Sequence, residues 1–69
     1  MAESYRFRTV NGIRHLVLTP EEWNRLLHHH YTGIITDPNS PTGWPVGTKT
    51  ALYWDQKHGT CLAPVIIDG

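Results

Sequence analysis

Residues 5–18, YRFRTVNGIRHLVL, decide the fold of this chain. Two runs rich in β-branched and aromatic residues flank Asn11-Gly12, the dipeptide that most strongly favours a two-residue type I′ hairpin turn. With these two residues as the turn, Phe7 faces Leu16 across the strands, and both lie on one apolar face of the hairpin. The opposite face holds Arg6, Arg8 and His15. The sequence therefore predicts a β-hairpin over residues 5–18.

The next residues carry the signals of a helix start. Thr19 is a favoured N-cap, Pro20 suits the first helical position, and Glu22 completes a capping box three residues after the cap. Apolar and aromatic side chains then recur at helical spacing, at Trp23, Leu26, Leu27, His30 and Tyr31. With Gly33 as the natural C-cap, we expect a helix over residues 20–32 that packs on the apolar face of the hairpin.

The second half of the sequence alternates between irregular and β-rich segments. Residues 37–47 hold three prolines and two glycines, which predicts a loop without regular structure. Residues 48–67 are typical of a second hairpin, in which Pro64 indicates that the last strand lies at a sheet edge or is bulged, because proline has no N–H. The expected fold class is α+β with the order ββαββ: one domain over residues 1–69, with the helix on one face of a small, mainly antiparallel sheet.

The composition limits the classes of function. The chain has 69 residues and one cysteine, Cys61, so an internal disulfide is impossible, and a core this small favours a homo-oligomer. Six Lys and Arg balance six Asp and Glu, which gives no overall attraction to nucleic acid. No apolar run reaches the roughly 18 residues of a membrane span, and the N-terminus lacks the pattern of a signal peptide. We expect a cytoplasmic protein with no membrane contact.

Two groups of chemically active residues are candidates for metal binding or catalysis, but their spacing in the sequence argues against both functions. His28, His29 and His30 are consecutive, and adjacent helix positions point about 100° apart, so the three imidazoles cannot converge on one ion. Asp55, His58 and Cys61 include an acid, a base and a nucleophile, but one hairpin loop supplies neither a pocket nor oxyanion donors. We therefore expect no enzyme activity, no metal and no cofactor.

The candidate partner-binding residues are of two kinds. Trp44 lies in the proline-rich loop, where it is either an anchor for another protein or a cap on the small core. Tyr53 is expected at an edge of the second hairpin, and its neighbour Trp54 in the core. The polar face of the first hairpin adds Arg6, Arg8 and His15. Together with Arg14, its arginines could bind phosphates along a two-stranded ribbon.

Residues 8–27, RTVNGIRHLVLTPEEWNRLL, resemble the hairpin-then-helix core of prevent-host-death antitoxins, in which a turn glycine and an apolar strand lead into a Ser/Thr-Pro-Glu-Glu-aromatic helix. The resemblance implies a regulator that binds nucleic acid. The family also has a helix before the hairpin and a toxin-binding helical tail, whereas this chain starts at the strand and ends in β-rich sequence. The resemblance therefore assigns no role to individual residues.

The main hypothesis is a small non-enzymatic accessory or regulatory module that binds another protein and forms a homo-oligomer through an open strand edge or Trp44. Its size alone suggests a phage or mobile-element origin. The alternative is a nucleic-acid-binding, antitoxin-like regulator that uses the arginine ribbon.

Overall fold

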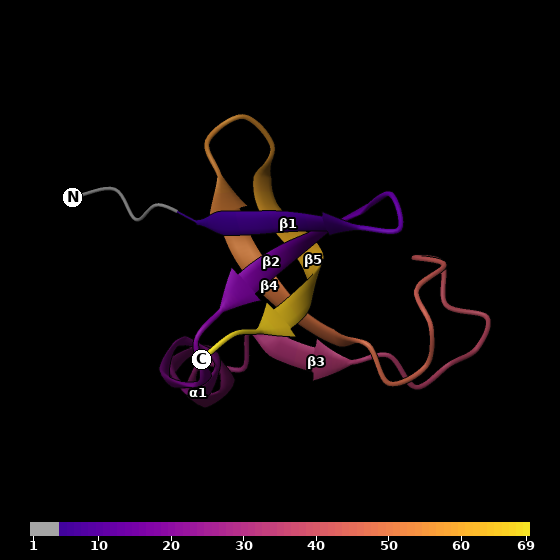
Figure 1. Ribbon diagram of the computed structural model, residues 1–69, viewed down its shortest axis with the longest axis horizontal. Coiled ribbons are helices and arrows are strands. Elements are labelled where there is room, and N and C mark those ends of the chain that lie inside the picture. The colour runs from indigo at the N-terminus through magenta and orange to yellow at the C-terminus, as the bar shows by residue number, and fades with distance from the viewer. Residues whose placement is uncertain (1–4) are drawn as a thin grey trace.

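The computed structural model describes residues 5–69 and shows an α+β fold (Figure 1). The elements in chain order are β1 (Arg6–Val10), β2 (Ile13–Leu18), α1 (Pro20–His28), β3 (Thr32–Ile34), β4 (Lys49–Asp55) and β5 (Gly59–Ile67). In this part of the chain the strands form a five-stranded sheet in the order β1-β2-β5-β4-β3. The α+β class is confirmed, but the predicted ββαββ order is wrong because β3 intervenes between the helix and the second hairpin.

The first hairpin has the predicted register. Phe7 pairs with Leu16 and Arg8 with His15 in the antiparallel ladder of β1 and β2. Asn11 and Gly12 form the turn with φ angles of 52° and 79°, the positive values that a type I′ turn requires. Leu16 is fully buried, so the apolar face of the hairpin points into the core.

The start of α1 is as predicted, but its end is not. The Thr19 side chain accepts a hydrogen bond from the Glu22 N–H, and the Glu22 side chain accepts one from the Thr19 N–H. The helix ends at His28, earlier than expected, and Gly33 is part of β3 rather than a C-cap. His30 takes the left-handed position instead, with φ 60°. The His30 N–H donates to Leu27 O and the Tyr31 N–H to Leu26 O, which together form a Schellman motif.

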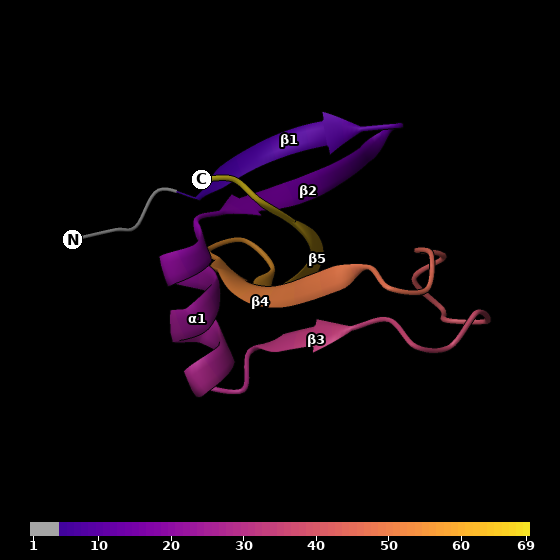
Figure 2. The same cartoon turned by 60° about the horizontal axis from the view of Figure 1, so that its bottom comes forward.

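The predicted apolar stripe of α1 is only partly buried. Trp23 and Leu26 pack against the core, whereas Leu27 is 51% exposed and His30 is also exposed. The reason is that α1 stands beside one end of the sheet, close to β2 and β3, rather than lying across a whole face (Figure 2). No residue of α1 is fully buried. This placement leaves the C-terminal half of the helix beside an uncovered part of β4.

β5 joins the two halves of the sheet. It pairs antiparallel with β4 from Gly59 to Pro64 and parallel with β2 from Val65 to Ile67. The prediction that the last strand lies at an edge is therefore wrong. The alternative of a bulge at Pro64 is wrong as well, because the register with β4 is unbroken from Gly59 to Pro64. The parallel pairing of β2 and β5 also makes the sheet mixed, a feature that two separate hairpins do not predict. In Figure 2, β5 passes between the layer of β1 and β2 and the layer of β3 and β4.

Pro64 is tolerated in this central strand because no ladder needs its missing N–H. The Leu52 N–H donates to Tyr31 O on the β3 side, so Leu52 and Leu62 are a non-hydrogen-bonded pair between β4 and β5. The pair Thr50–Pro64 lies two residues further along and is of the same kind. The Pro64 nitrogen therefore faces β2, just before the parallel pairing begins at Val65. The fully buried proline marks the point at which β5 changes partners.

The core is small and lies between the two hairpins. Its buried apolar residues are Leu16, Val17, Leu18, Ala51, Ala63 and Val65. Residues 35–48 form the expected irregular connection, which projects away from α1 (Figure 2). Within residues 5–69, no helix has the length and apolar character needed to cross a membrane.

Candidate protein-binding groove

The arginine face of the first hairpin, Arg6, Arg8 and His15, is occupied by groups of the same chain. The Arg6 guanidinium lies 3.1 Å from Glu22 Oε1. Arg8 lies 3.8 Å from Asp68 Oδ2, next to the end of β5. His15 Nδ1 lies 2.8 Å from its acceptor, Ile13 O. These contacts place carboxylates beside both arginines and reduce the positive potential of this face.

Arg14 lies on the other face of the hairpin. Its guanidinium carbon is 3.7 Å from the centre of the Phe7 ring, a cation–π contact. The three arginines of the ribbon are thus divided between two faces, and only Arg6 and Arg8 share a surface. A basic ribbon for gripping phosphates is correspondingly weaker than the sequence suggests.

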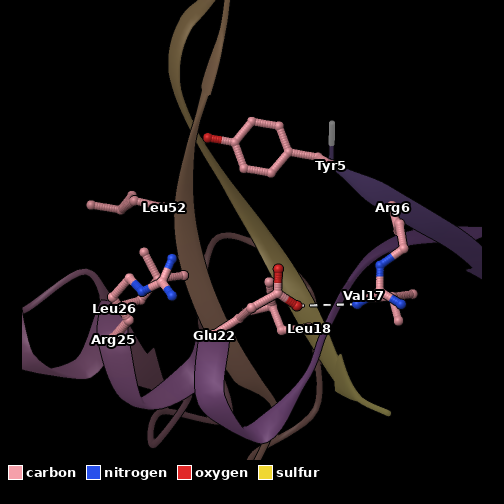
Figure 3. Close-up of a pocket in the computed structure, with 8 residues that line it drawn as sticks. All are labelled: Tyr5, Arg6, Val17, Leu18, Glu22, Arg25, Leu26 and Leu52. Atoms are coloured by element: carbon pink, nitrogen blue, oxygen red, sulfur yellow. Dashed lines mark hydrogen bonds and ion pairs between the residues drawn. The ribbon is translucent and has the colours of Figure 1, made fainter. Parts of the chain in front are cut away.

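Glu22 links the arginine face to the helix start. The Thr19 N–H that donates to its carboxylate, together with Arg6, holds the pKa of Glu22 below its usual range, although partial burial acts in the opposite direction. Figure 3 shows the Glu22 carboxylate pointing into a hollow between α1 and Tyr5, with Arg6 on one side. This hollow of about 280 Å³ also borders Leu26 and Leu52.

An aromatic groove continues from this hollow along β4. Its volume is about 400 Å³, and it shares Tyr5, Leu26 and Leu52 with the hollow of Figure 3. The residues that line the aromatic groove are Tyr5, Leu26, Tyr31, Leu52, Tyr53, Trp54 and Thr60. None of them carries a charge at neutral pH. Trp54 is 63% exposed and Tyr31 is 50% exposed, a large uncovered area for aromatic side chains in so small a domain.

Tyr53 and Trp54 have exchanged the positions that the sequence predicted. Tyr53 is half-buried, and its ring makes edge-to-face contacts with Tyr5 and Phe7 at 5.5 and 5.4 Å between ring centres. Burial raises the pKa of Tyr53, and the neighbouring Cys61 thiol adds to this effect. Trp54 points to the opposite face of β4, because successive side chains of a strand alternate. Tyr53 therefore forms the inner wall of the groove and Trp54 its outer wall.

Trp44, the other predicted partner-binding residue, is separate from the groove. It is half-buried within the 35–48 connection, where its backbone N–H donates to Thr42 Oγ1 at 3.2 Å. The connection is organised by its own hydrogen bonds, including those from the Ile35 N–H to Thr48 O and from the Gly47 N–H to Ile35 O. Trp44 is not one of the half-buried side chains that pack against the core, so it does not cap the core, and its indole still presents part of its surface.

The acid, base and nucleophile of the second hairpin take part in two separate contacts. His58 Nδ1 lies 3.0 Å from Asp55 Oδ2, and this contact, with the Lys57 N–H, lowers the pKa of Asp55. The Cys61 thiol donates instead to Gly59 O at 3.6 Å. In the described part of the chain, no hydrogen bond joins Cys61 to His58.

The histidine run is likewise dispersed. His29 stacks on Tyr31 with 5.9 Å between ring centres, while His30 occupies the helix cap. Over residues 5–69, no group of three or more His, Cys, Asp or Glu side chains is placed to hold a metal ion.

No family model, curated protein or solved structure matches this chain. The resemblance of residues 8–27 to prevent-host-death antitoxins thus gains no support beyond the local hairpin-and-helix pattern. The candidate site is defined by the geometry alone.

Sequence reasoning found Tyr53 but missed Tyr31 and Trp54. A signal for Trp54 was present in the register of the second hairpin. Tyr53 pairs with Cys61 and Ala51 with Ala63, which are small or apolar residues suited to the core face. By strand alternation, Trp54 then has to face outward. Tyr31 carried no such signal, because its position depends on where the helix ends.

Proposed function

We propose that this chain is a non-enzymatic accessory module that binds another protein through the aromatic groove. The observation that carries this proposal is the exposure of Trp54 and Tyr31 around an uncharged groove. Tryptophan and tyrosine, together with arginine, are the residues that most often dominate the binding energy of protein interfaces, whereas Lys, Glu and Asp are depleted there. A single free cysteine suits a reducing, cytoplasmic setting for this encounter.

The arginine face supports nucleic-acid binding less well. Phosphates would have to displace Glu22 from Arg6 and Asp68 from Arg8, and the chain has no net charge to attract them. Surface ion pairs of this kind are weak, so phosphates of a tightly bound nucleic acid could displace these two carboxylates. The test below therefore includes nucleic acid as a possible captured partner.

The proposal is tested by capture from a lysate of the cell that carries the gene, with the immobilised chain as bait. We expect Trp54→Ala to weaken capture of the partner protein about 30-fold or more, the effect of losing an interface anchor worth about 2 kcal/mol. Trp44→Ala is the matched control, since it removes a second tryptophan outside the groove. Both variants should melt as the unmodified chain does.

Two results would contradict this assignment. Capture that depends on Trp44 but not on Trp54 would move the contact surface to the 35–48 connection. Capture of nucleic acid that Arg6→Glu and Arg8→Glu abolish, and that falls steeply with salt, would favour the antitoxin-like alternative.

A further inference from the structure

Within residues 5–69, the distal half of β4 (residues 52–55) has no neighbouring strand on the side away from β5. β3 pairs with β4 only from Lys49 to Ala51, whereas β4 continues to Asp55. The last described contact on this side is the hydrogen bond from the Leu52 N–H to Tyr31 O, at 2.9 Å. Beyond it lies the aromatic groove.

The end of the helix is the reason why the ladder stops here. In a continued antiparallel ladder, the Tyr31 N–H would donate to Leu52 O. It donates instead to Leu26 O at 3.0 Å and so closes α1. The helix cap and the strand ladder compete for the Tyr31 N–H, and this N–H bonds within the cap. The Leu52 carbonyl consequently faces the groove side without this ladder bond.

The backbone of Trp54 faces the same way. Leu52 directs its N–H away from β5, and hydrogen-bonding direction repeats every second residue along a strand. The N–H and C=O of Trp54 therefore also point away from its cross-strand partner Thr60, toward the side on which Tyr31 lies. Among the described residues, Leu52 O, Trp54 N–H and Trp54 O form a row of acceptor, donor and acceptor with no ladder partner.

The charge of the groove limits what can occupy it. Its lining residues are neutral. Among residues 5–69, charged side chains are found only around it: Arg6, Glu22 and Arg25 line the adjoining hollow, and Asp55 ends β4. A charged side chain buried in the groove would lose its hydration and find no counter-charge there, which is costly. Charge complementarity thus favours an uncharged segment, flanked by rings that provide apolar contact on both sides.

We propose that an extended, uncharged segment of a partner protein adds to β4 beside Trp54 as a further strand, in line with β3. This inference rests on the proposed function and specifies its binding mode. The segment donates N–H groups to Leu52 O and Trp54 O and accepts from the Trp54 N–H. Its side chains alternate between the Tyr53 wall and the Trp54 wall, as expected for strand addition.

A displayed library of linear peptides about eight residues long, within the usual range of strand lengths, is the probe. It is selected against the full chain. We expect the enriched peptides to be uncharged at their central positions and to lose binding when proline replaces the central residue, because proline cannot donate an N–H. Failure to enrich any such peptide, or enrichment of peptides whose binding tolerates proline throughout, would overturn the proposal.

The decisive variant is a chemically synthesised chain with an N-methyl group on the Trp54 amide, which removes the donor and retains the indole. We expect its affinity for a selected peptide to fall about tenfold or more, as for the loss of one backbone hydrogen bond with a methyl group in its place. N-methylation of Leu62 is the matched control. The Leu62 amide also points away from the β4–β5 ladder, on a stretch of β5 that precedes its pairing with β2.

The outcomes separate this inference from the proposed function. If N-methyl-Trp54 binds normally while Trp54→Ala does not, the groove recognises side chains only, and strand addition is wrong although protein binding stands. If the free chain dimerises and the Trp54 N–H is protected from hydrogen exchange without peptide, a second copy occupies the edge, and the foreign segment is ruled out. If Trp54→Ala changes neither peptide binding nor capture from lysate, both proposals fail.

Discussion

The arginine face and the aromatic groove lie on neighbouring parts of one sheet, yet their groups are satisfied to very different extents. On the arginine face, Arg6 has Glu22 and Arg8 has Asp68 as partners within the chain. In the groove, Trp54 and Tyr31 keep half or more of their surface exposed, and part of the β4 backbone lacks a ladder partner among residues 5–69. From the sequence, the charged residues make the arginine face the more obvious binding surface. In the structure, the groups without partners lie in the groove instead.

The largest expected difference is in the free energy of unfolding, between an aromatic residue beneath the arginine face and one in the groove. Phe7 touches Arg14 and Tyr53 beneath the arginine face, so Phe7→Ala should lower the free energy of unfolding by about 2–3 kcal/mol, somewhat less than for a fully buried ring. Tyr31→Ala, in the groove, should lower it by less than about 1 kcal/mol because half of its surface already meets water. Urea denaturation measures both. Equal losses would remove the distinction between a surface used by the fold and one left for a partner.

A smaller effect is expected where the arginine face meets the helix. The pKa of Glu22 is lowered in the folded chain, so its ionised form contributes stability that is present at neutral pH and is lost as the pH falls below the usual glutamate value of about 4.3. Glu22→Gln should cost about 0.5–1 kcal/mol at pH 7, a modest value because solvent screens a side chain that is 45% exposed, and should flatten the acid dependence. Thermal melts between pH 3 and pH 7 (roughly the span of carboxyl titration) test this.

Glu21→Gln is the matched control, since Glu21 is also acidic and in the first turn but takes no part in the capping box. If both variants show the same acid dependence, the helix dipole rather than the Thr19 and Arg6 contacts is responsible.

The smallest expected effect lies at the border of the groove. His30 adopts a left-handed conformation that glycine adopts more easily, so His30→Gly should raise the free energy of unfolding by about 0.5 kcal/mol. It should leave peptide binding unchanged, because the Tyr31 N–H stays on Leu26 O. His29→Gly is the control and should destabilise, since His29 has a φ of −94°. A loss of stability in His30→Gly would show that the imidazole itself supports the cap.

The sequence predicted the structure best where the decisive contacts are local. The Asn11-Gly12 turn, the hairpin register and the Thr19 cap each depend on residues only a few positions apart, and all are confirmed. The end of the helix was predicted wrongly because Gly33 is the more usual cap, whereas the chain places His30 there and uses Gly33 in β3. An alanine Cβ at position 33 would lie 3.1 Å from Thr50 Oγ1, a close approach that only the tertiary structure reveals.

Features that depend on distant residues were not predictable in the same way. β3 is three residues long, too short to show an alternating pattern, and Pro64 is normally a marker of edge strands. The central position of Pro64 became clear only from the change of partner along β5. In the candidate site, Tyr53 was identified from its strand, but the role of Trp54 depends on which face of β4 meets the core.

The path of β5 has a consequence for the order in which the chain acquires its structure. The first hairpin closes between adjacent residues and can form early, on the microsecond scale of isolated hairpins. The parallel pairing of Leu16 with Val65 instead joins residues that are far apart in the sequence, so forming it costs the entropy of closing a long loop that contains α1, β3 and β4. Because Leu16 and Val65 both belong to the core, neither half can complete its hydrophobic contacts until this last pairing forms. We therefore expect the docking of residues 65–67 onto β2 to limit the folding rate. The N-terminal hairpin should be only partly structured before this step.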